Sequence, residues 1–185
     1  KCKCLILTTG TFLNGVIHIS DVNFPAGRYG EFASQNLAES LKNSGFETAR
    51  LKTGTPARIN YNSINFNKTL IQKPDNPPIP FSFSTEKITN RQIPCYITYT
   101  NQNTHRIIRN NLKYSPMYGI NKTISGIGVR YCPSIEDKII KFADKERHQL
   151  FLEREGYNTN EVYVNGLSTS LPEVAQYKIL HSIDG

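Results

Sequence analysis

The spacing of hydrophobic residues changes along the chain from alternation to helical periodicity and back, which predicts a mixture of strands and helices. The clearest strand covers residues 92–100, where Cys95, Ile97 and Tyr99 lie on one face and Tyr96 on the other. Further strands are expected over residues 4–9, 13–19, 48–52 and 149–153. Four prolines between 67 and 80 predict an extended loop there.

Four helices are expected from start and stop signals. Ser34 opens one that Gly45 stops, and Thr104 caps a basic one that runs to about 113. Ser134 with Asp137 three residues later is a capping-box pattern. The buried face of that third helix is predicted to be Ile135, Ile139, Phe142 and Ala143. The last helix follows Ser170, with Pro172 in its first turn.

The amino-acid composition limits the class of protein and the kinds of binding partner that are possible. The 185 residues are enough for one domain or one and a half, and no apolar run is long enough to span a membrane. Four cysteines lack zinc or disulfide spacing and fit a reducing cytosol. A net charge of +7 favours polyanionic partners such as nucleic acid, although it also fits a merely basic soluble protein. Because the chain begins inside an expected strand, it looks cut from a longer one.

Cys132 is the strongest candidate for chemistry. It lies between a glycine-containing loop and the helix that Ser134 opens, and the unpaired amides of a helix start attract anions. The helix dipole and nearby cations, Arg130 and Lys138, would stabilise a thiolate, which a nucleophilic or acid–base cysteine requires. The competing interpretation is a small buried residue beside a helix cap.

Two further features are weaker. Gly10 ends an expected strand, where an open α/β sheet meets its ligand, yet the chain has no complete G-x-G-x-x-G. Arg106, Arg109 and Lys113 form one basic stripe on the second helix. That stripe fits a phosphate backbone and fits a solvated helix face equally well.

Eleven stretches, in order, carry a resemblance to a known family. They are LTTGTFLNG (7–15), PAGR (25–28), GEFAS (30–34), LKTGTPARI (51–59), PCYIT (94–98), TN (100–101), TH (104–105), SPMY (115–118), RYCPSIEDK (130–138), FLE (151–153) and NGLSTSLP (165–172). Together they are similar to the middle of the GidA/MnmG family of tRNA-modifying enzymes, over nearly the whole chain.

The resemblance implies a mixed α/β (α+β) fold: part of a glutathione-reductase-like FAD domain and an inserted β-rich domain associated with nicotinamide. Residues 1–55 would belong to the FAD domain, 56–165 to the inserted domain, and 166–185 would return toward the first. Gly10, Thr11 and Ser34 would contact FAD. The nicotinamide-binding segment maps onto Gly128, Arg130, Tyr131, Cys132, Pro133, Ser134, Ile135, Glu136, Asp137, Lys138 and Phe142.

The resemblance also implies an activity. The family uses FAD reduced by NADH, with methylenetetrahydrofolate as one-carbon donor. With the GTPase MnmE it adds an aminomethyl or carboxymethylaminomethyl group to C5 of the wobble uridine of tRNA. A homodimer, a heterotetramer with MnmE and a cytoplasmic location are expected. Cys132 would act as nucleophile toward C6 of uracil or as a proton-transfer group.

Departures from the family pattern keep other functions open. Val129 and Arg154 replace prolines that are usual in the family, and residues 119–125 differ from its Ser-Gly-rich turn. One alternative is the folate- and FAD-dependent tRNA methyltransferase TrmFO, and another is a non-catalytic basic fragment of a decayed gene. By itself this chain is expected to bind FAD poorly and to catalyse nothing.

Overall fold

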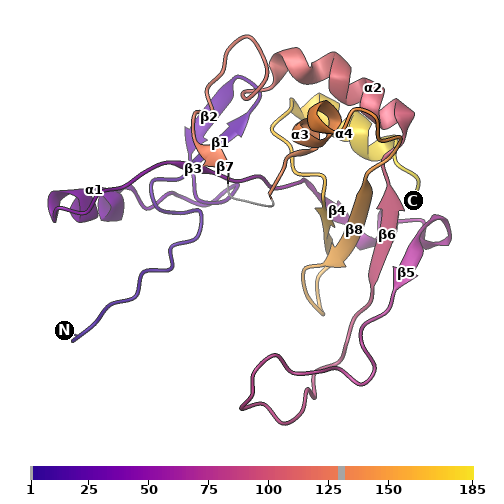
Figure 1. The fold of residues 1–185 in the computed structure, drawn as a ribbon, viewed down its shortest axis with the longest axis horizontal. Helices are drawn as coiled ribbons and strands as arrows, with labels where there is room; N and C mark the ends of the chain where they lie inside the picture. The colour runs from indigo at the N-terminus through magenta and orange to yellow at the C-terminus, as the bar shows by residue number, and fades with distance from the viewer. Residues whose placement is uncertain (1, 129–131) are drawn as a thin grey trace.

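The computed structural model describes residues 2–128 and 132–185. Helices and strands are both present, so the predicted mixed α and β class is confirmed. Across the described ranges, the longest helix has ten residues, and none is long and apolar enough to cross a membrane. The main part of the molecule is a sheet with helices packed on it, and a less compact N-terminal region extends to one side (Figure 1).

The sheet has five antiparallel strands in the order β4-β9-β8-β6-β5. Their bounds are β4 (Arg58–Asn60), β5 (Leu70–Gln72), β6 (Cys95–Tyr99), β8 (Gln149–Arg154) and β9 (Glu161–Asn165). Ile97 of β6 pairs with Phe151, and Leu152 of β8 pairs with Val164. Alternate residues such as Leu150, Leu152 and Val164 are buried, so one face of the central strands is directed into the core.

Three helices cover this face and lie side by side in Figure 1: α2 (Gln102–Asn111), α3 (Ile135–Lys141) and α4 (Glu173–His181). The core that they share with the sheet consists of Ile108, Ile135, Ile139, Leu150, Leu152, Val162, Val164, Leu167, Leu171, Ala175 and Ile179. Residues 166–185, assigned by the sequence to a return toward the flavin domain, contribute four of these side chains. The domain boundaries themselves stay a prediction.

The N-terminal region contains a hairpin of β1 (Val16–Ile19) and β2 (Val22–Pro25), then α1 (Gln35–Asn43) and the short β3 (Leu51–Lys52). β3 pairs in parallel with β7 (Ile127–Gly128), which joins this region to the segment before α3. Helix α1 buries none of its residues. Short 3-10 helices elsewhere are η1 (Tyr61–Ser63), η2 (Phe66–Lys68) and η3 (Leu112–Tyr114).

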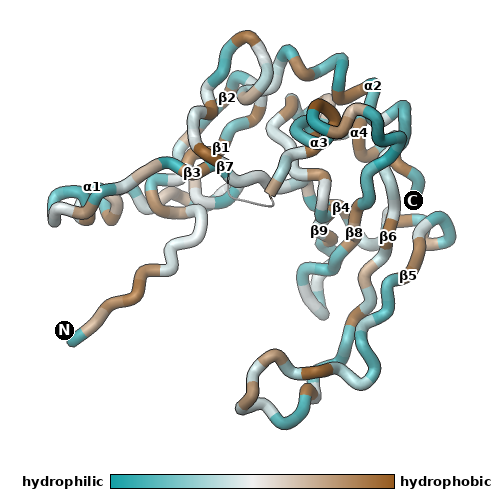
Figure 2. The backbone as a smooth tube through the Cα atoms, viewed as in Figure 1, coloured by the Kyte–Doolittle hydropathy of each residue, from teal (hydrophilic) through white to brown (hydrophobic). Residues whose placement is uncertain are grey.

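The strand predicted at residues 4–9 is absent from the described chain. Leu5 and Ile6 are 72% and 84% exposed, and Figure 2 shows this hydrophobic stretch running free of the rest of the molecule. The hydrophobic pattern suits a strand, but a strand also needs a hydrogen-bonding partner, and no described segment pairs with this one. The strand predicted at 13–19 is shorter than expected, and only β1 forms.

Several other predictions are corrected in detail. The loop predicted at 67–80 contains β5, because the prolines begin only at Pro74. Asn101, not Thr104, is the N-cap of α2, since its side chain accepts a hydrogen bond from the Thr104 amide at 2.9 Å. Phe142 is half exposed because α3 ends at Lys141, before Phe142 and Ala143 can join its buried face. Strands β4 and β9 were not anticipated.

Candidate functional site

The start of α3 is organised by the predicted capping box. The Asp137 amide donates to Ser134 Oγ at 3.1 Å, and the Ser134 amide donates to Asp137 Oδ2 at 3.0 Å. Both residues are buried. This reciprocal pair satisfies two amides at the helix start and fixes the direction in which the chain enters α3.

Cys132 lies two residues before this cap and is partly exposed. Its sulfur is 3.6 Å from Oγ1 of Thr53, which directly follows β3. A hydroxyl at that distance can donate a hydrogen bond to sulfur or accept one. Val129, Arg130 and Tyr131 lie outside the described residues. The contribution predicted for Arg130 and Tyr131 therefore stays a prediction.

Asp137 links the capping box to β3. Its Oδ2 is 3.2 Å from Nζ of Lys52, and its Oδ1 accepts a hydrogen bond from the Tyr118 hydroxyl. Burial alone would raise the pKa of Asp137, but the hydrogen bonds from Tyr118, the Ser134 amide and Lys52 outweigh it and hold that pKa well below its usual range. Burial and the same hydrogen bond raise the pKa of Tyr118. This group therefore combines an ionised carboxylate with a protonated phenol.

Glu136 is fully buried on the other side of α3. Its Oε1 accepts hydrogen bonds from Thr169 Oγ1 at 3.0 Å and from the Ser170 amide at 3.2 Å. Its Oε2 has no hydrogen-bond partner among the described residues. Burial raises the pKa of Glu136, although these hydrogen bonds oppose the shift. Its carboxyl group joins α3 to the chain before α4.

The predicted nicotinamide segment thus divides into an inner and an outer part. Ile135, Glu136 and Asp137 are buried, and Nζ of Lys138 donates to the Gly166 carbonyl at 2.8 Å. The described residues of the segment that are open to solvent are Gly128, Cys132, Pro133, Lys138 in part, and Phe142. Only the outer residues are placed to touch a bound molecule, and the nicotinamide site itself stays a prediction.

The three residues predicted to contact FAD come from two segments that the structure brings together. The Ser34 amide donates to the Phe12 carbonyl at 2.8 Å, next to Thr11. Gly10 is exposed, has a left-handed backbone (φ +55°), and a Cβ built on it meets nothing within 4 Å. Thr11 Oγ1 donates to the Gly27 carbonyl at 2.6 Å. The structure therefore places these residues near one another, and their contact with FAD stays a prediction.

The three residues of the predicted basic stripe lie on the surface, but not on one helix, because α2 ends at Asn111 and Lys113 lies in η3. Arg106, Arg109 and Lys113 are all exposed. Arg106 donates to Asn103 Oδ1 at 2.8 Å, and the Lys113 ammonium lies 5.0 Å from the centre of the Tyr114 ring. These contacts leave the stripe accessible and fit both phosphate contacts and a solvated face.

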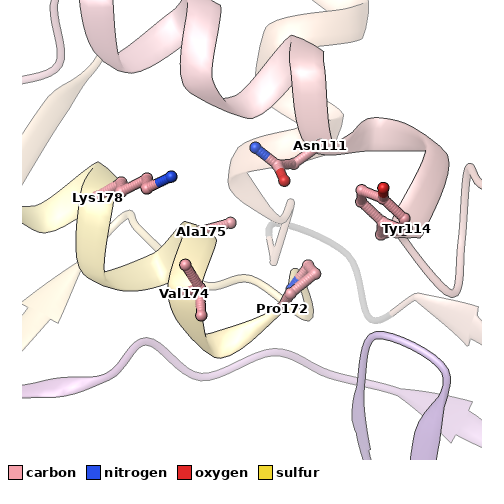
Figure 3. Close-up of a pocket in the computed structure, with 6 residues that line it drawn as sticks. All are labelled: Asn111, Tyr114, Pro172, Val174, Ala175 and Lys178. Carbon is pink, nitrogen blue, oxygen red and sulfur yellow. The ribbon is translucent and has the colours of Figure 1, made fainter.

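A surface pocket of about 280 Å³ lies between the end of α2 and the start of α4. Figure 3 shows the residues that line it: Asn111, Tyr114, Pro172, Val174, Ala175 and Lys178. None of them is a predicted site residue. No group of three His, Cys, Asp or Glu side chains within residues 2–128 and 132–185 is arranged to hold a metal ion.

Sequence reasoning gave no role to Lys52, Thr53 or Tyr118. Lys52 and Thr53 lie within LKTGTPARI, and Tyr118 ends SPMY, two stretches that carried the resemblance. That was the only signal available, because Thr53 and Cys132 are far apart in sequence and no local periodicity relates them.

Comparison with known proteins gives a consistent result. The family model described as "Glucose inhibited division protein A" matches residues 1–185. The chain is 58% identical over 183 residues to a protein of Thermodesulfovibrio yellowstonii and 55% identical over 183 residues to one of Geobacter sulfurreducens. Both are named tRNA uridine 5-carboxymethylaminomethyl modification enzyme MnmG. Each match covers 99% of this chain and 29% of the relative.

A solved structure matches as well. The form I crystal structure of Aquifex aeolicus GidA superimposes with a TM-score of 0.81 and 52% sequence identity. The match covers 96% of this chain and 30% of that one. This chain therefore spans about 30% of the length of the relatives it matches. Their names do not favour the methyltransferase alternative.

Proposed function

Since this chain belongs to the glucose inhibited division protein A family, we propose that it forms part of an enzyme that modifies the wobble uridine of tRNA. The product would carry an aminomethyl or carboxymethylaminomethyl group at C5. The names of relatives 54–58% identical to the chain support this reaction, as does the likeness to Aquifex aeolicus GidA. Four free cysteines fit a cytoplasmic setting.

Cys132 is the residue of this chain proposed to react. The observation that carries the assignment is its partly exposed sulfur beside the Thr53 hydroxyl, two residues before the rigid start of α3. As a nucleophile, the thiolate would form a bond from sulfur to C6 of uracil, and the electron pair of the C5–C6 double bond would move toward C5 and O4. C5 would then attack an electrophilic one-carbon unit, whose bond to its carrier would break, and an amine co-substrate would bond to the same carbon to supply the nitrogen of the product. Loss of the C5 proton and cleavage of the S–C6 bond would restore the double bond and the thiolate.

The second role for Cys132 is proton transfer at C5 or C6 without a covalent bond. A tRNA with 5-fluorouridine at the wobble position separates the two roles, because fluorine cannot leave C5 as the proton does. A nucleophilic Cys132 predicts a protein–tRNA adduct that persists in denaturing gels and is lost in Cys132→Ser. A proton-transfer role predicts no adduct in either protein.

The proposed cofactors are FAD, NADH and methylenetetrahydrofolate. FAD would lie against Gly10, Thr11 and Ser34, and the nicotinamide dinucleotide against the outer part of residues 128–142. When bound, these groups would supply reducing equivalents and the one-carbon unit. The chain's own residues would orient Cys132 and would contact each cofactor through their solvent-exposed atoms.

The proposed partners are tRNA and the GTPase MnmE, with the protein acting as a homodimer that joins MnmE in a heterotetramer. Arg106 and Arg109 of α2 and Lys113 of η3 would contact tRNA phosphates, since exposed cations supply affinity without reading sequence. The +7 net charge favours such a partner.

The deciding experiment is complementation of a bacterial strain that lacks MnmG, using the complete product of the gene that encodes this chain. Restored 5-carboxymethylaminomethyl uridine in tRNA nucleosides is the expected result. Cys132→Ser is expected to lower the modification rate at least about 100-fold. Equal modification by Cys132→Ser would remove this residue from the reaction, and no modification by the wild-type protein would remove the proposed activity.

A further inference from the structure

The contact between Thr53 and Cys132 depends on how β3 and β7 pair. β3 ends at Lys52 and β7 ends at Gly128, and the two strands run in parallel with Lys52 opposite Gly128. Thr53 comes next after β3, which places its hydroxyl 3.6 Å from the Cys132 sulfur.

β3 is held in place from the core side. Nζ of Lys52 lies 3.2 Å from Asp137 Oδ2 and 3.2 Å from Met117 Sδ. The side chain of Asp137 is only 8% exposed, and that of Lys52 is 20% exposed. A largely buried ion pair resists breaking, because separation would leave the carboxylate paired only with the more exposed Lys141, whose Nζ lies 3.4 Å from Asp137 Oδ1.

The same carboxylate fixes the chain on the other side of Cys132. Asp137 accepts hydrogen bonds from the Ser134 amide and hydroxyl, at 3.0 and 3.1 Å, and from the Tyr118 hydroxyl. Cys132 lies two residues before Ser134, which donates to Asp137. Its sulfur contacts Thr53, which directly follows Lys52, the ion-pair partner of Asp137. The buried carboxylate of Asp137 therefore binds both the chain that follows Cys132, at Ser134, and the chain that precedes Thr53, at Lys52.

We propose that Thr53 is a positioning residue for Cys132, holding the sulfur through its hydroxyl, and that the Lys52–Asp137 ion pair holds Thr53 in place. This inference rests on the proposed reactivity of Cys132. The hydroxyl forms a hydrogen bond with the sulfur at 3.6 Å, which selects one orientation of the cysteine side chain. The threonine methyl group plays no part in this interaction, so serine is expected to replace threonine.

The test measures how fast iodoacetamide alkylates Cys132 in the complete gene product, without tRNA or cofactors. Trypsin releases residues 131–138 as a peptide with a single cysteine, so mass spectrometry reports Cys132 alone. Thr53→Val and Thr53→Ala are expected to lower the rate constant about threefold, because the sulfur is then no longer held in the orientation in which it is partly exposed. Thr53→Ser is expected to stay within about 1.5-fold of wild type.

Cys95 supplies an internal control. It lies on β6, burial and then the nearby Glu153 raise the pKa of its thiol, and its tryptic peptide, residues 92–106, contains no other cysteine. Its alkylation should be equally slow in every variant. A variant in which Cys95 becomes fast has lost the fold of the sheet, and the other hydroxyl-free variant then decides.

Two results would overturn the inference: wild-type alkylation rates in Thr53→Val and Thr53→Ala, or an equal loss in Thr53→Ser. Failure of the proposed function is seen separately, as unaltered tRNA modification by Cys132→Ser. The alkylation rate does not depend on that outcome, because it needs neither tRNA nor catalysis.

Discussion

The two regions of this molecule differ in how far they bury their own apolar side chains. All eleven members of the main core lie between Ile108 and Ile179, on the sheet, on its three helices and on the connection between β9 and α4. Among residues 2–55, only Ala26 and Gly27 are buried, while Leu5, Ile6 and Phe46 are 63–84% exposed. Burial of apolar surface is the main force that stabilises a fold. The sheet region is therefore stabilised by its own buried core. The N-terminal region buries too little of its own apolar surface to be stabilised in this way.

The largest expected effect compares one hydrophobic truncation in each region. Ile108 is 0% exposed and Leu37 of α1 is 38% exposed. Ile108→Ala is expected to lower the free energy of unfolding by about 3 kcal/mol, because it removes core contacts and leaves a cavity. Leu37→Ala is expected to cost less than about 0.5 kcal/mol. Urea unfolding of the 185-residue chain, followed by circular dichroism, measures both changes in the free energy of unfolding. Equal losses in the two variants would contradict the view that the sheet region alone carries the stabilising core.

The next effect concerns the junction between the regions. Asp137→Asn is expected to cost about 2 kcal/mol at pH 7, because it removes the charge that pairs with Lys52 and with Lys141. Since the pKa of Asp137 is lowered in the folded state, its contribution is complete above the pKa of the unfolded chain and is lost as pH falls through the folded value. The wild-type and variant unfolding curves should therefore converge in strong acid.

The matched control for this variant is Asp184→Asn. The Asp184 side chain is 77% exposed, and its partner Lys68 lies 4.0 Å away. Its loss should change the free energy of unfolding by less than about 0.5 kcal/mol at any pH. A cost for Asp137→Asn no larger than that of the control would contradict the proposal that the Lys52–Asp137 ion pair holds β3 against α3.

A smaller effect distinguishes the helix starts of the two regions. Asn101 caps α2 through its side chain and also donates to the Ser182 carbonyl at 2.6 Å, whereas Ser34 makes no side-chain cap on α1. Asn101→Ala is expected to cost about 1.5 kcal/mol and Ser34→Ala only a few tenths. Urea midpoints of the two variants check this, and a larger loss for Ser34→Ala would show that α1 contributes more stability than its exposure indicates.

The smallest effect is a pH dependence of the sheet region. Burial lowers the pKa of both His105 and His148, whose rings lie 5.3 Å apart. The unfolded chain then binds more protons in weak acid, so stability is full above the unfolded pKa and falls as pH drops through the folded values. Replacing His148 by Gln should flatten the stability profile between pH 7 and 5, and replacing the exposed His181 should not. An unchanged slope in His148→Gln would exclude His148 as a cause.

The same contrast explains what the sequence could predict. The strand around Ile97 and the capping box of Ser134 and Asp137 were recognisable, because each follows from local spacing. Strand β9 carried a usable signal that was missed: Val162 and Val164, both buried, alternate with polar neighbours. The segment at 4–9 has strand composition without a strand, because pairing is decided by distant residues.

For the site, the sequence pointed to Cys132 and to the helix that follows it. It could not reveal Thr53, since the two residues meet only through the pairing of β3 with β7. Nor could it show that Asp137 points inward while Pro133 remains exposed. The sequence therefore predicted the reactive residue, whereas the residues that contact it could be identified only from the tertiary structure.

The pairing of β4 with β9 has a consequence for synthesis of the protein on the ribosome. Ile59 is opposite Val162, about 100 residues further along the chain. At a translation rate of about 5–20 residues per second, β4 waits roughly 5–20 s before its partner exists. During that interval Ile59 has no strand to cover it, so a nascent chain paused before residue 160 would be a preferred substrate for a ribosome-bound chaperone.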